Sequence, residues 1–166
     1  GVQTCALPIS QPAQQARYNE RLFDPQLYPP NANISDRRRI SNELDEFLKS
    51  EIEEPSALGS FLRLNNALER VSTPTSQALI DRIKEVQSEN ESVEILFRVR
   101  ESDSLIWEDR AELSLEFRII GRPPNRLNPN YRANFLRSET PITARFVFKT
   151  TTWELVDFEG TIPPLS

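Results

Sequence analysis

The spacing of apolar residues changes near Asn90, from a helical period of about 3.6 residues to a strand period of 2. Before Asn90, apolar residues recur four positions apart, as in Ile40, Leu44 and Leu48. After Asn90, apolar residues alternate with charged ones, as in the run Glu-Ile-Leu-Phe-Arg-Val-Arg at residues 94–100. The change predicts helices first and strands second, which is the element order of an α+β fold.

Three segments of the first half have a helical period. We expect helices over residues 35–51, 58–71 and 74–90. Ser35 and Asp36 are both residue types that cap a helix N-terminus, so the first helix should begin there. Thr73 can cap the third helix, because Pro74 then occupies the first helical position, where no N–H partner is needed.

The second half predicts strands that bury one face and leave the other in water. The segments with this alternation are residues 93–99, 111–119, 142–148 and 153–158. One wet face is typical of antiparallel sheets. The expected fold is therefore α+β, with about three N-terminal helices packed on one face of a four- to five-stranded antiparallel sheet.

Composition separates two N-terminal segments from the domain. Residues 1–9, Gly-Val-Gln-Thr-Cys-Ala-Leu-Pro-Ile, resemble the translation of a sequencing-library adapter, so we expect them not to belong to the native protein. Residues 10–34 are rich in Gln, Pro, Asn and Ala and predict a linker or an extended arm. Such an arm could dock through Leu22, Phe23, Leu27 and Tyr28. We expect one domain over residues 35–162 and a tail over residues 163–166.

The order of elements resembles a known family. Two or three helices followed by long antiparallel strands, ending in the run Trp-Glu-Leu-Val-Asp-Phe-Glu-Gly at residues 153–160, resemble the NTF2-like superfamily of cone-shaped α+β domains. The resemblance covers residues 35–162 and implies a conical space between helices and sheet. A cystatin-like arrangement has the same element order. NTF2-like domains serve as enzymes, binding cups and dimerisation modules, so the resemblance selects no function.

The chain lacks residue types that several kinds of active site and metal site require. The chain has no His, and its single Cys, Cys5, lies in the adapter-like segment. Nucleophiles activated by His and zinc sites built from Cys and His are therefore excluded. Outside the adapter-like segment, Gly59, Gly121 and Gly160 are isolated from one another, so no phosphate-binding loop pattern occurs. We expect no metal and no other cofactor.

Charged residues also lie on the wet face of the predicted sheet. Glu94, Glu112 and Glu116 are candidate catalytic carboxylates by type, but their alternation places them in water. There we expect them to form cross-strand ion pairs. The basic residues available to them are Arg98, Arg118, Arg145 and Lys149.

The strongest candidate site lies in residues 121–140, which predict a long loop between two strands. This segment combines arginines with aromatic residues, the residue types that are enriched at interaction hot spots. The candidate binding residues are Arg122, Arg126, Tyr131, Arg132, Phe135 and Arg137. We expect a non-catalytic interaction domain that uses this loop to bind a protein partner of unknown identity.

Two other functions remain open. One is small-molecule binding or carboxylate-based catalysis in an NTF2-like cavity, which would need an interior space of roughly 300 Å³ or more holding a buried acid. The other is binding of RNA or an anionic surface through the loop and residues 37–39.

The remaining expectations concern partners and location. A net charge of −5 argues against DNA binding. A membrane would be reached only through an anchor upstream of residue 10, and the sequence does not indicate the compartment. A homodimer that forms through the sheet is a further arrangement that stays open.

Overall fold

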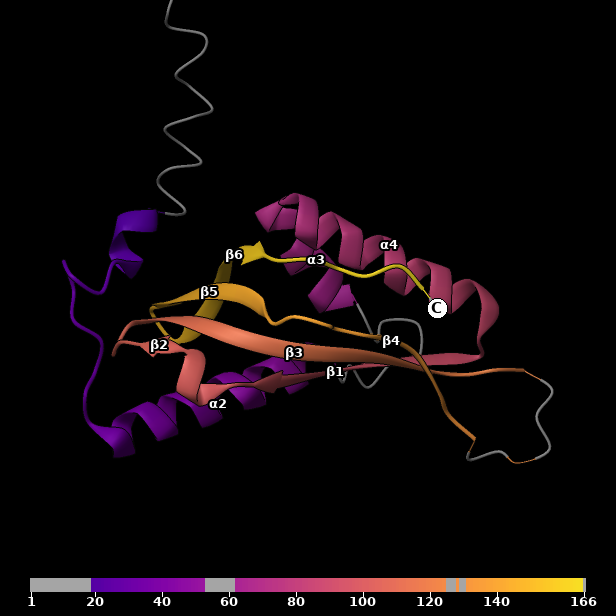
Figure 1. Ribbon diagram of the computed structural model, residues 1–166, viewed down its shortest axis with the longest axis horizontal. Coiled ribbons are helices and arrows are strands. Elements are labelled where there is room, and N and C mark those ends of the chain that lie inside the picture. The colour runs from indigo at the N-terminus through magenta and orange to yellow at the C-terminus, as the bar shows by residue number, and fades with distance from the viewer. Residues whose placement is uncertain (1–18, 53–61, 125–127, 129–130, 166) are drawn as a thin grey trace, which may run out of the picture.

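The computed structural model describes residues 19–52, 62–124, 128 and 131–165 (Figure 1). The helices are α2 (Ile34–Ile52), α3 (Leu62–Val71) and α4 (Pro74–Glu89). Short 3-10 turns are formed by η2 (Glu20–Phe23) and η3 (Glu101–Asp103). The strands are β1 (Ser92–Val99), β2 (Leu105–Ile106), β3 (Arg110–Arg122), β4 (Ala133–Arg137), β5 (Ile142–Lys149) and β6 (Thr152–Glu159).

The α+β class and the helix-then-strand order are confirmed. The described residues form one antiparallel sheet of six strands rather than the four or five expected. Its order is β1-β3-β5-β6, with β2 paired to the start of β3 and β4 paired to its end. The long strand β3 therefore lies at the centre of the sheet and organises it.

Helix boundaries follow from capping. Helix α4 begins as predicted, with the Thr73 hydroxyl accepting from the Ser76 backbone N–H at 3.1 Å and the Ser76 hydroxyl accepting from the Thr73 backbone N–H at 2.9 Å. Helix α2 begins one residue earlier than predicted. The cap is Asn33, rather than Ser35 or Asp36. Its side-chain oxygen accepts a hydrogen bond from the Ser35 backbone N–H at 2.9 Å.

The predicted apolar stripes build one core. The inner face of β3 buries every second residue from Ala111 to Gly121, and the helices supply Ile40, Leu44, Leu68 and Ile83 at 1% exposure or less. Phe146 of β5 packs edge to face against Phe47 of α2, at a ring distance of 6.2 Å.

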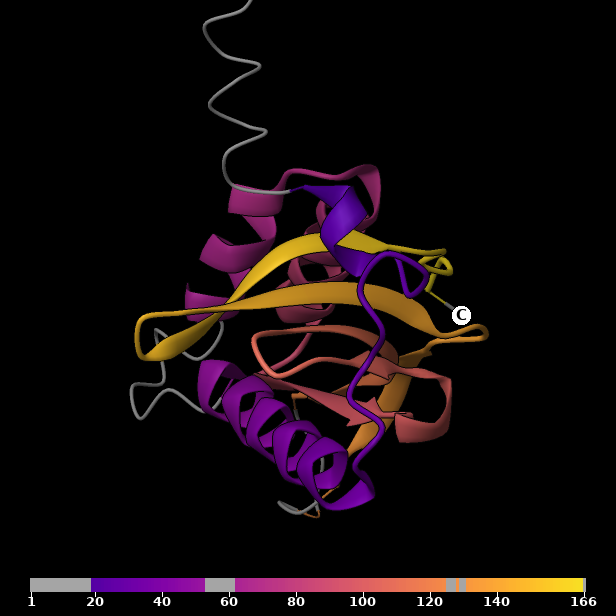
Figure 2. The same cartoon turned by 90° about the vertical axis from the view of Figure 1, so that its left-hand side faces the viewer.

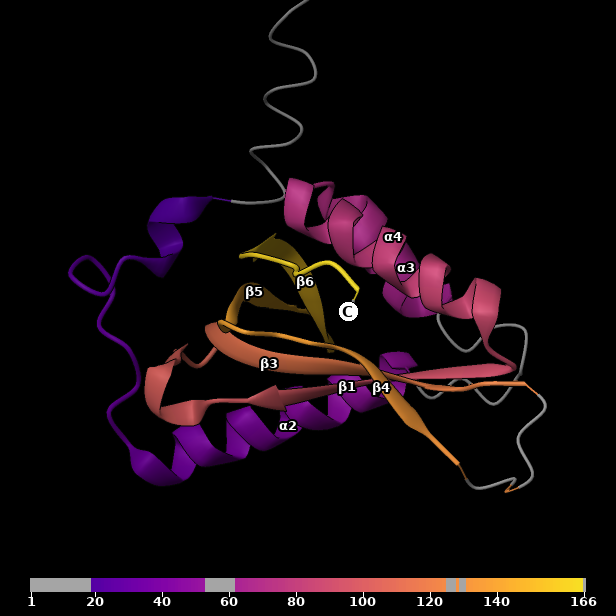
Figure 3. The ribbon, with the colours of Figure 1, turned by 45° about the vertical axis from the view of Figure 1, so that its right-hand side comes forward.

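The helices do not form one layer side by side, and this corrects the expected arrangement. Helix α2 lies along β1 and β2 at one edge of the sheet, and α3 lies against β6 at the opposite edge (Figure 3). Helix α4 contacts β6 and also β1 and β3. Helix α3 contacts both α2 and α4, so the three helices cover different parts of the inner face around one shared core.

Helix side chains cover the open edge of β6. The Thr73 hydroxyl donates to the Phe158 carbonyl at 2.6 Å, and the Arg70 guanidinium donates to the Leu155 carbonyl at 3.3 Å. These contacts satisfy carbonyls that a neighbouring strand would otherwise pair. They therefore leave β6 a poor edge for pairing with a second copy.

Two local expectations were wrong. The segment predicted as a 20-residue loop contains the end of β3 and the whole of β4, so the connection between the two strands covers only residues 123–132. Phe148 ends the alternating segment 142–148 and was expected to face the interior with its other apolar residues. It is instead 41% exposed and packs against Trp153 at the turn between β5 and β6.

Residues 19–33 lie against the end of the sheet, and we call them the N-terminal arm. In Figure 2, which shows the left-hand end of Figure 1, the arm passes in front of the strand ends before it enters α2. Its Phe23 is 4% exposed, whereas Leu27 and Tyr28 are 49% and 43% exposed. A single buried aromatic residue thus anchors the arm.

Candidate functional site

The outer face of the sheet, opposite the helices, contains a groove of about 460 Å³. It crosses three strands at the point where β3 changes its partner from β5 to β4. Besides Phe97 and Phe117, its lining consists of Leu96, Arg98, Glu116, Arg118, Arg137 and Ser138. We call this hollow the arginine groove.

Strand register places the side chains of the arginine groove together. Arg118 of β3 is paired with Leu96 of β1 on one side and with Arg137 of β4 on the other. Two residues before Arg118 on β3, Glu116 is paired with Arg98 of β1. Directly opposed residues of antiparallel strands share a face, so all five project from the outer surface.

The positive charge of the arginine groove is not neutralised by the described residues. The side chains of Arg98, Arg118 and Arg137 form no hydrogen bond or ion pair within the described part of the chain. Glu116 contacts Arg100 instead, at 3.9 Å. Three arginines and one glutamate thus give the groove a net positive charge in a chain of net charge −5, a distribution that attracts anions.

Ser138 adds a hydrogen-bond donor at the end of the groove. Its hydroxyl oxygen accepts from the Phe117 backbone N–H, and its own N–H donates to the Phe117 carbonyl, both at 2.9 Å. These two bonds fix Ser138 beside β3 and leave the hydroxyl proton available to an acceptor.

The structure separates the predicted binding residues. Arg122 ends β3 and lies 3.6 Å from a Glu91 carboxylate oxygen. Tyr131 and Arg132 are exposed just before β4, where the Arg132 guanidinium donates to the Tyr131 carbonyl. Arg137 is the one predicted residue that lines the arginine groove. Arg126 lies outside the described residues.

Phe135 has a structural position rather than an exposed one. It is half-buried and packs on the core, with its ring directly over Gly121. A Cβ atom on Gly121 would lie 2.8 Å from Phe135 Cε2, so the absence of a side chain there makes room for the ring. This packing favours a structural role for Phe135, and its predicted role in binding stays a prediction.

Sequence reasoning missed Arg98 and Arg118. Both were expected to pair with acidic residues of the wet face, and the Arg145–Glu112 pair at 2.8 Å shows that such pairing does occur elsewhere on the sheet. The alternation correctly placed both arginines outward. Alternation does not provide the strand register, which places Glu116 opposite Arg98 and Arg137 opposite Arg118. Glu116 forms its ion pair with Arg100, so neither Arg98 nor Arg118 forms the expected ion pair in the described part of the chain.

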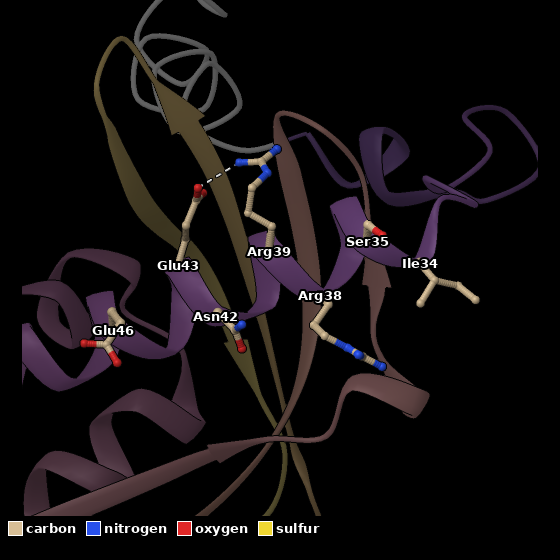
Figure 4. Close-up of a pocket in the computed structure, with 7 residues that line it drawn as sticks. All are labelled: Ile34, Ser35, Arg38, Arg39, Asn42, Glu43 and Glu46. Atoms are coloured by element: carbon tan, nitrogen blue, oxygen red, sulfur yellow. Dashed lines mark hydrogen bonds and ion pairs between the residues drawn. The ribbon is translucent and has the colours of Figure 1, made fainter.

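A second hollow lies on the exposed side of α2. Figure 4 shows its lining residues, among them Ile34, Arg38 and the Arg39–Glu43 ion pair at 2.8 Å. All of its lining residues come from this one helix. Because no second element forms a wall, this hollow is less suited to holding a ligand than the arginine groove, which several strands line.

The described residues leave little space at the contact of α2, α3 and the inner face of the sheet. The space left between α2, α3 and the inner face of the sheet has a volume of only about 20 Å³ and an apolar lining. Phe97, Phe146 and Phe158 are among the side chains that surround it. This is far below the roughly 300 Å³ of a small-molecule pocket.

The other charged cluster of the outer face surrounds Arg145. The guanidinium is 14% exposed and contacts Glu112, Asp157 and, at 3.6 Å, Glu159. Partial burial, followed by the charge of Asp157, raises the pKa of the Glu159 carboxyl above its ordinary value. This cluster is internally paired, in contrast to the arginine groove.

Among the described residues, neither the side-chain requirement of a metal site nor the helix requirement of a membrane span is met. The described residues contain no group of three or more His, Cys, Asp or Glu side chains placed to hold a metal ion. Within the same residues, no helix has both the length and the apolar character needed to cross a membrane. No protein-family model, curated protein or solved structure matches this chain significantly.

Proposed function

We propose that this chain is a non-catalytic interaction domain that binds an acidic segment of a partner protein in the arginine groove. The observation that carries the proposal is the group formed by Arg98, Arg118 and Arg137, three arginines on neighbouring strands with no described partner. Guanidinium groups form strong hydrogen bonds with carboxylates, so an acidic segment supplies the missing partners.

The shape and position of the groove favour a protein segment. The groove is open and crosses three strands, so an extended chain can lie across it. Leu96 adds an apolar side chain to the lining of the groove, directly beside Arg118. Apolar contact combined with arginine is the composition of interface hot spots.

The small space left among the described residues of the interior favours binding over catalysis. A small-molecule site of the NTF2-like kind would need the conical space to be open, and about 20 Å³ cannot hold a substrate. The carboxylates nearest the groove contribute ion pairs rather than a buried base, since Glu116 lies against Arg100.

The test compares two triple variants that change the net charge equally. The first carries Arg98→Ser, Arg118→Ser and Arg137→Ser. The second carries Arg21→Ser, Arg38→Ser and Arg39→Ser, which removes three exposed arginines from the arm and from the hollow on α2. Fluorescence anisotropy with a labelled oligoglutamate peptide measures the affinity of each variant and of the unaltered protein.

We expect the groove variant to bind at least about tenfold more weakly, which corresponds to a loss of about 1.4 kcal/mol. The control variant should bind like the unaltered protein, and binding should weaken as salt rises. Equal losses in both variants would overturn the proposal, because only overall charge would then matter. Tighter groove-dependent binding to oligouridylate RNA or to phosphatidylserine vesicles would replace the protein partner by one of those ligands.

A further inference from the structure

The N-terminal arm is held at the opposite end of the outer face from the arginine groove. The ring of Phe23 packs edge to face against Trp107, with ring centres 5.8 Å apart. On the same side, the Arg145 guanidinium lies 5.8 Å from the centre of the Phe23 ring. An aromatic residue in a pocket of this kind is an anchor whose burial contributes affinity.

The domain also holds the main chain of the arm. The Arg110 Nε donates to the Leu22 carbonyl at 2.6 Å, and the Trp107 indole N–H donates to the Tyr28 carbonyl at 2.6 Å. The Asn31 backbone N–H donates to the Ile106 carbonyl at 2.7 Å. Bonds to main-chain atoms do not depend on the side chain at those positions, which is how many peptide-binding domains hold their ligands.

Arg110 joins the two parts of this contact. Its guanidinium carbon lies 4.8 Å from the Tyr28 ring centre and 5.3 Å from that of Trp107, and its side chain is only 12% exposed. The same residue thus binds a main-chain carbonyl and stacks on a ring of the arm. The domain side of the contact is provided by Trp107 and Arg110. Arg110 is the first residue of β3, and Trp107 lies three residues before it.

We propose that the surface around Trp107 and Arg110 is a peptide-binding site, occupied here by the chain's own arm, that also accepts a separate peptide of the same chemistry. The peptide has a phenylalanine anchor and two captured carbonyls, one on the residue before the anchor and one five residues after it. This site is distinct from the arginine groove and does not depend on the function proposed for it.

The arm competes with any separate peptide. A tethered segment acts at an effective concentration that reaches the millimolar range for short linkers, so the covalently attached arm has a large advantage. A separate peptide should therefore bind well only after the arm's own anchor is weakened. Phe23→Ala does this without altering the domain side of the site.

The experiment uses the full chain and a labelled peptide with the sequence of residues 19–33. We expect fluorescence anisotropy to show at least tenfold tighter binding to the Phe23→Ala protein than to the unaltered protein. Adding Trp107→Phe to Phe23→Ala, which keeps an aromatic ring but removes the indole donor, should lower the affinity again. A peptide with alanine in place of its phenylalanine serves as the matched control and should not bind.

Two results would overturn the proposal. One is equal affinity of the peptide for the unaltered and the Phe23→Ala proteins, and the other is equal binding of the phenylalanine and alanine peptides. If Phe23→Ala prevents folding, as shown by circular dichroism, Phe23→Leu replaces it. That variant keeps an apolar side chain but removes the ring that packs against Trp107, and the same order of affinities is expected and decisive.

Discussion

Arg118 on β3 stands directly opposite Arg137 on β4, so two positive side chains share one face of the sheet as immediate cross-strand neighbours. Like charges in this arrangement are unfavourable for folding. The described residues provide neither arginine with an acidic partner. We therefore expect the pair to lower the stability of the free protein and to favour the binding of an anion.

The first prediction is that removing one of these charges stabilises the protein while weakening its binding. Arg137→Gln should raise the free energy of unfolding by roughly 0.2–0.5 kcal/mol, the low end of cross-strand pair energies, because both side chains are exposed. Urea denaturation measures the change, and Arg38→Gln on α2 serves as the control. A loss of stability in Arg137→Gln would show that Arg137 has a structural role.

The second prediction concerns Phe135, which the sequence grouped with the binding residues. Phe135→Ala should lower the free energy of unfolding by about 2 kcal/mol, less than for a fully buried phenylalanine, because the ring is half-buried. Asn134→Ala, an exposed neighbour on β4, should change it by less than about 0.5 kcal/mol. Affinity for the oligoglutamate peptide should stay the same in the folded Phe135→Ala protein, and a selective loss of binding would support its predicted role in binding.

A third prediction tests the close packing of Gly121 against Phe135. Gly121→Ala alone should destabilise the protein, because the new Cβ would lie 2.8 Å from Phe135 Cε2. Combining it with Phe135→Ala should cost less than the sum of the two single changes, since the smaller side chain removes that clash. Part of the cost should remain, because Asn90 Cγ also lies 2.8 Å from the same position. Strictly additive losses in urea denaturation would contradict this packing.

The missed strand β4 shows why alternation alone did not predict the whole sheet. Phe135 and Leu136 are adjacent apolar residues, which breaks the period of 2. The structure accommodates both through a shift in register between Ile119 and Ile120, where Leu136 and Asn134 are the pairing partners and Phe135 is extra. A bulge of this kind depends on tertiary contacts, so a segment that contains one resembles a loop in sequence.

The candidate site was predictable only in part, for a related reason. Alternation correctly assigned Arg98 and Arg118 to the outer face, and the arginine content of residues 121–140 correctly drew attention to Arg137. The sequence could not bring the three together, because that depends on the pairing of β1, β3 and β4 in a particular register. Helix stripes needed no such information, and Ile40 and Leu44 are buried as expected.

The fourth prediction is that Arg145 is required for stability. Its guanidinium contacts the carboxylates of Glu112 and Asp157, and the Asp157 side chain is only 7% exposed. Arg145→Met should lower the free energy of unfolding by about 3 kcal/mol, because it removes the Arg145 charge that contacts the buried Asp157 carboxylate. Lys149→Met removes an exposed pair with Glu154 and should cost less than about 1 kcal/mol. Similar small losses in both variants would show that water screens the Arg145 cluster.

The fifth prediction follows from the raised pKa of Glu159. Its carboxyl has an ordinary pKa of 4.5, and in the folded protein partial burial and the charge of Asp157 raise the pKa despite the attraction of Arg145. The folded protein therefore holds this proton more tightly than the unfolded chain does. As the pH rises through the interval between 4.5 and the raised pKa, stability falls, and the loss persists at higher pH.

Glu159→Gln removes this titration and should be more stable than the unaltered protein at neutral pH. The difference in free energy of unfolding should shrink as the pH falls and vanish below about 4.5, where the unaltered Glu159 is protonated in both states. Urea denaturation at a series of pH values measures the difference. A less stable Glu159→Gln protein at neutral pH would mean that the attraction of Arg145, 3.6 Å away, outweighs burial and the repulsion of Asp157.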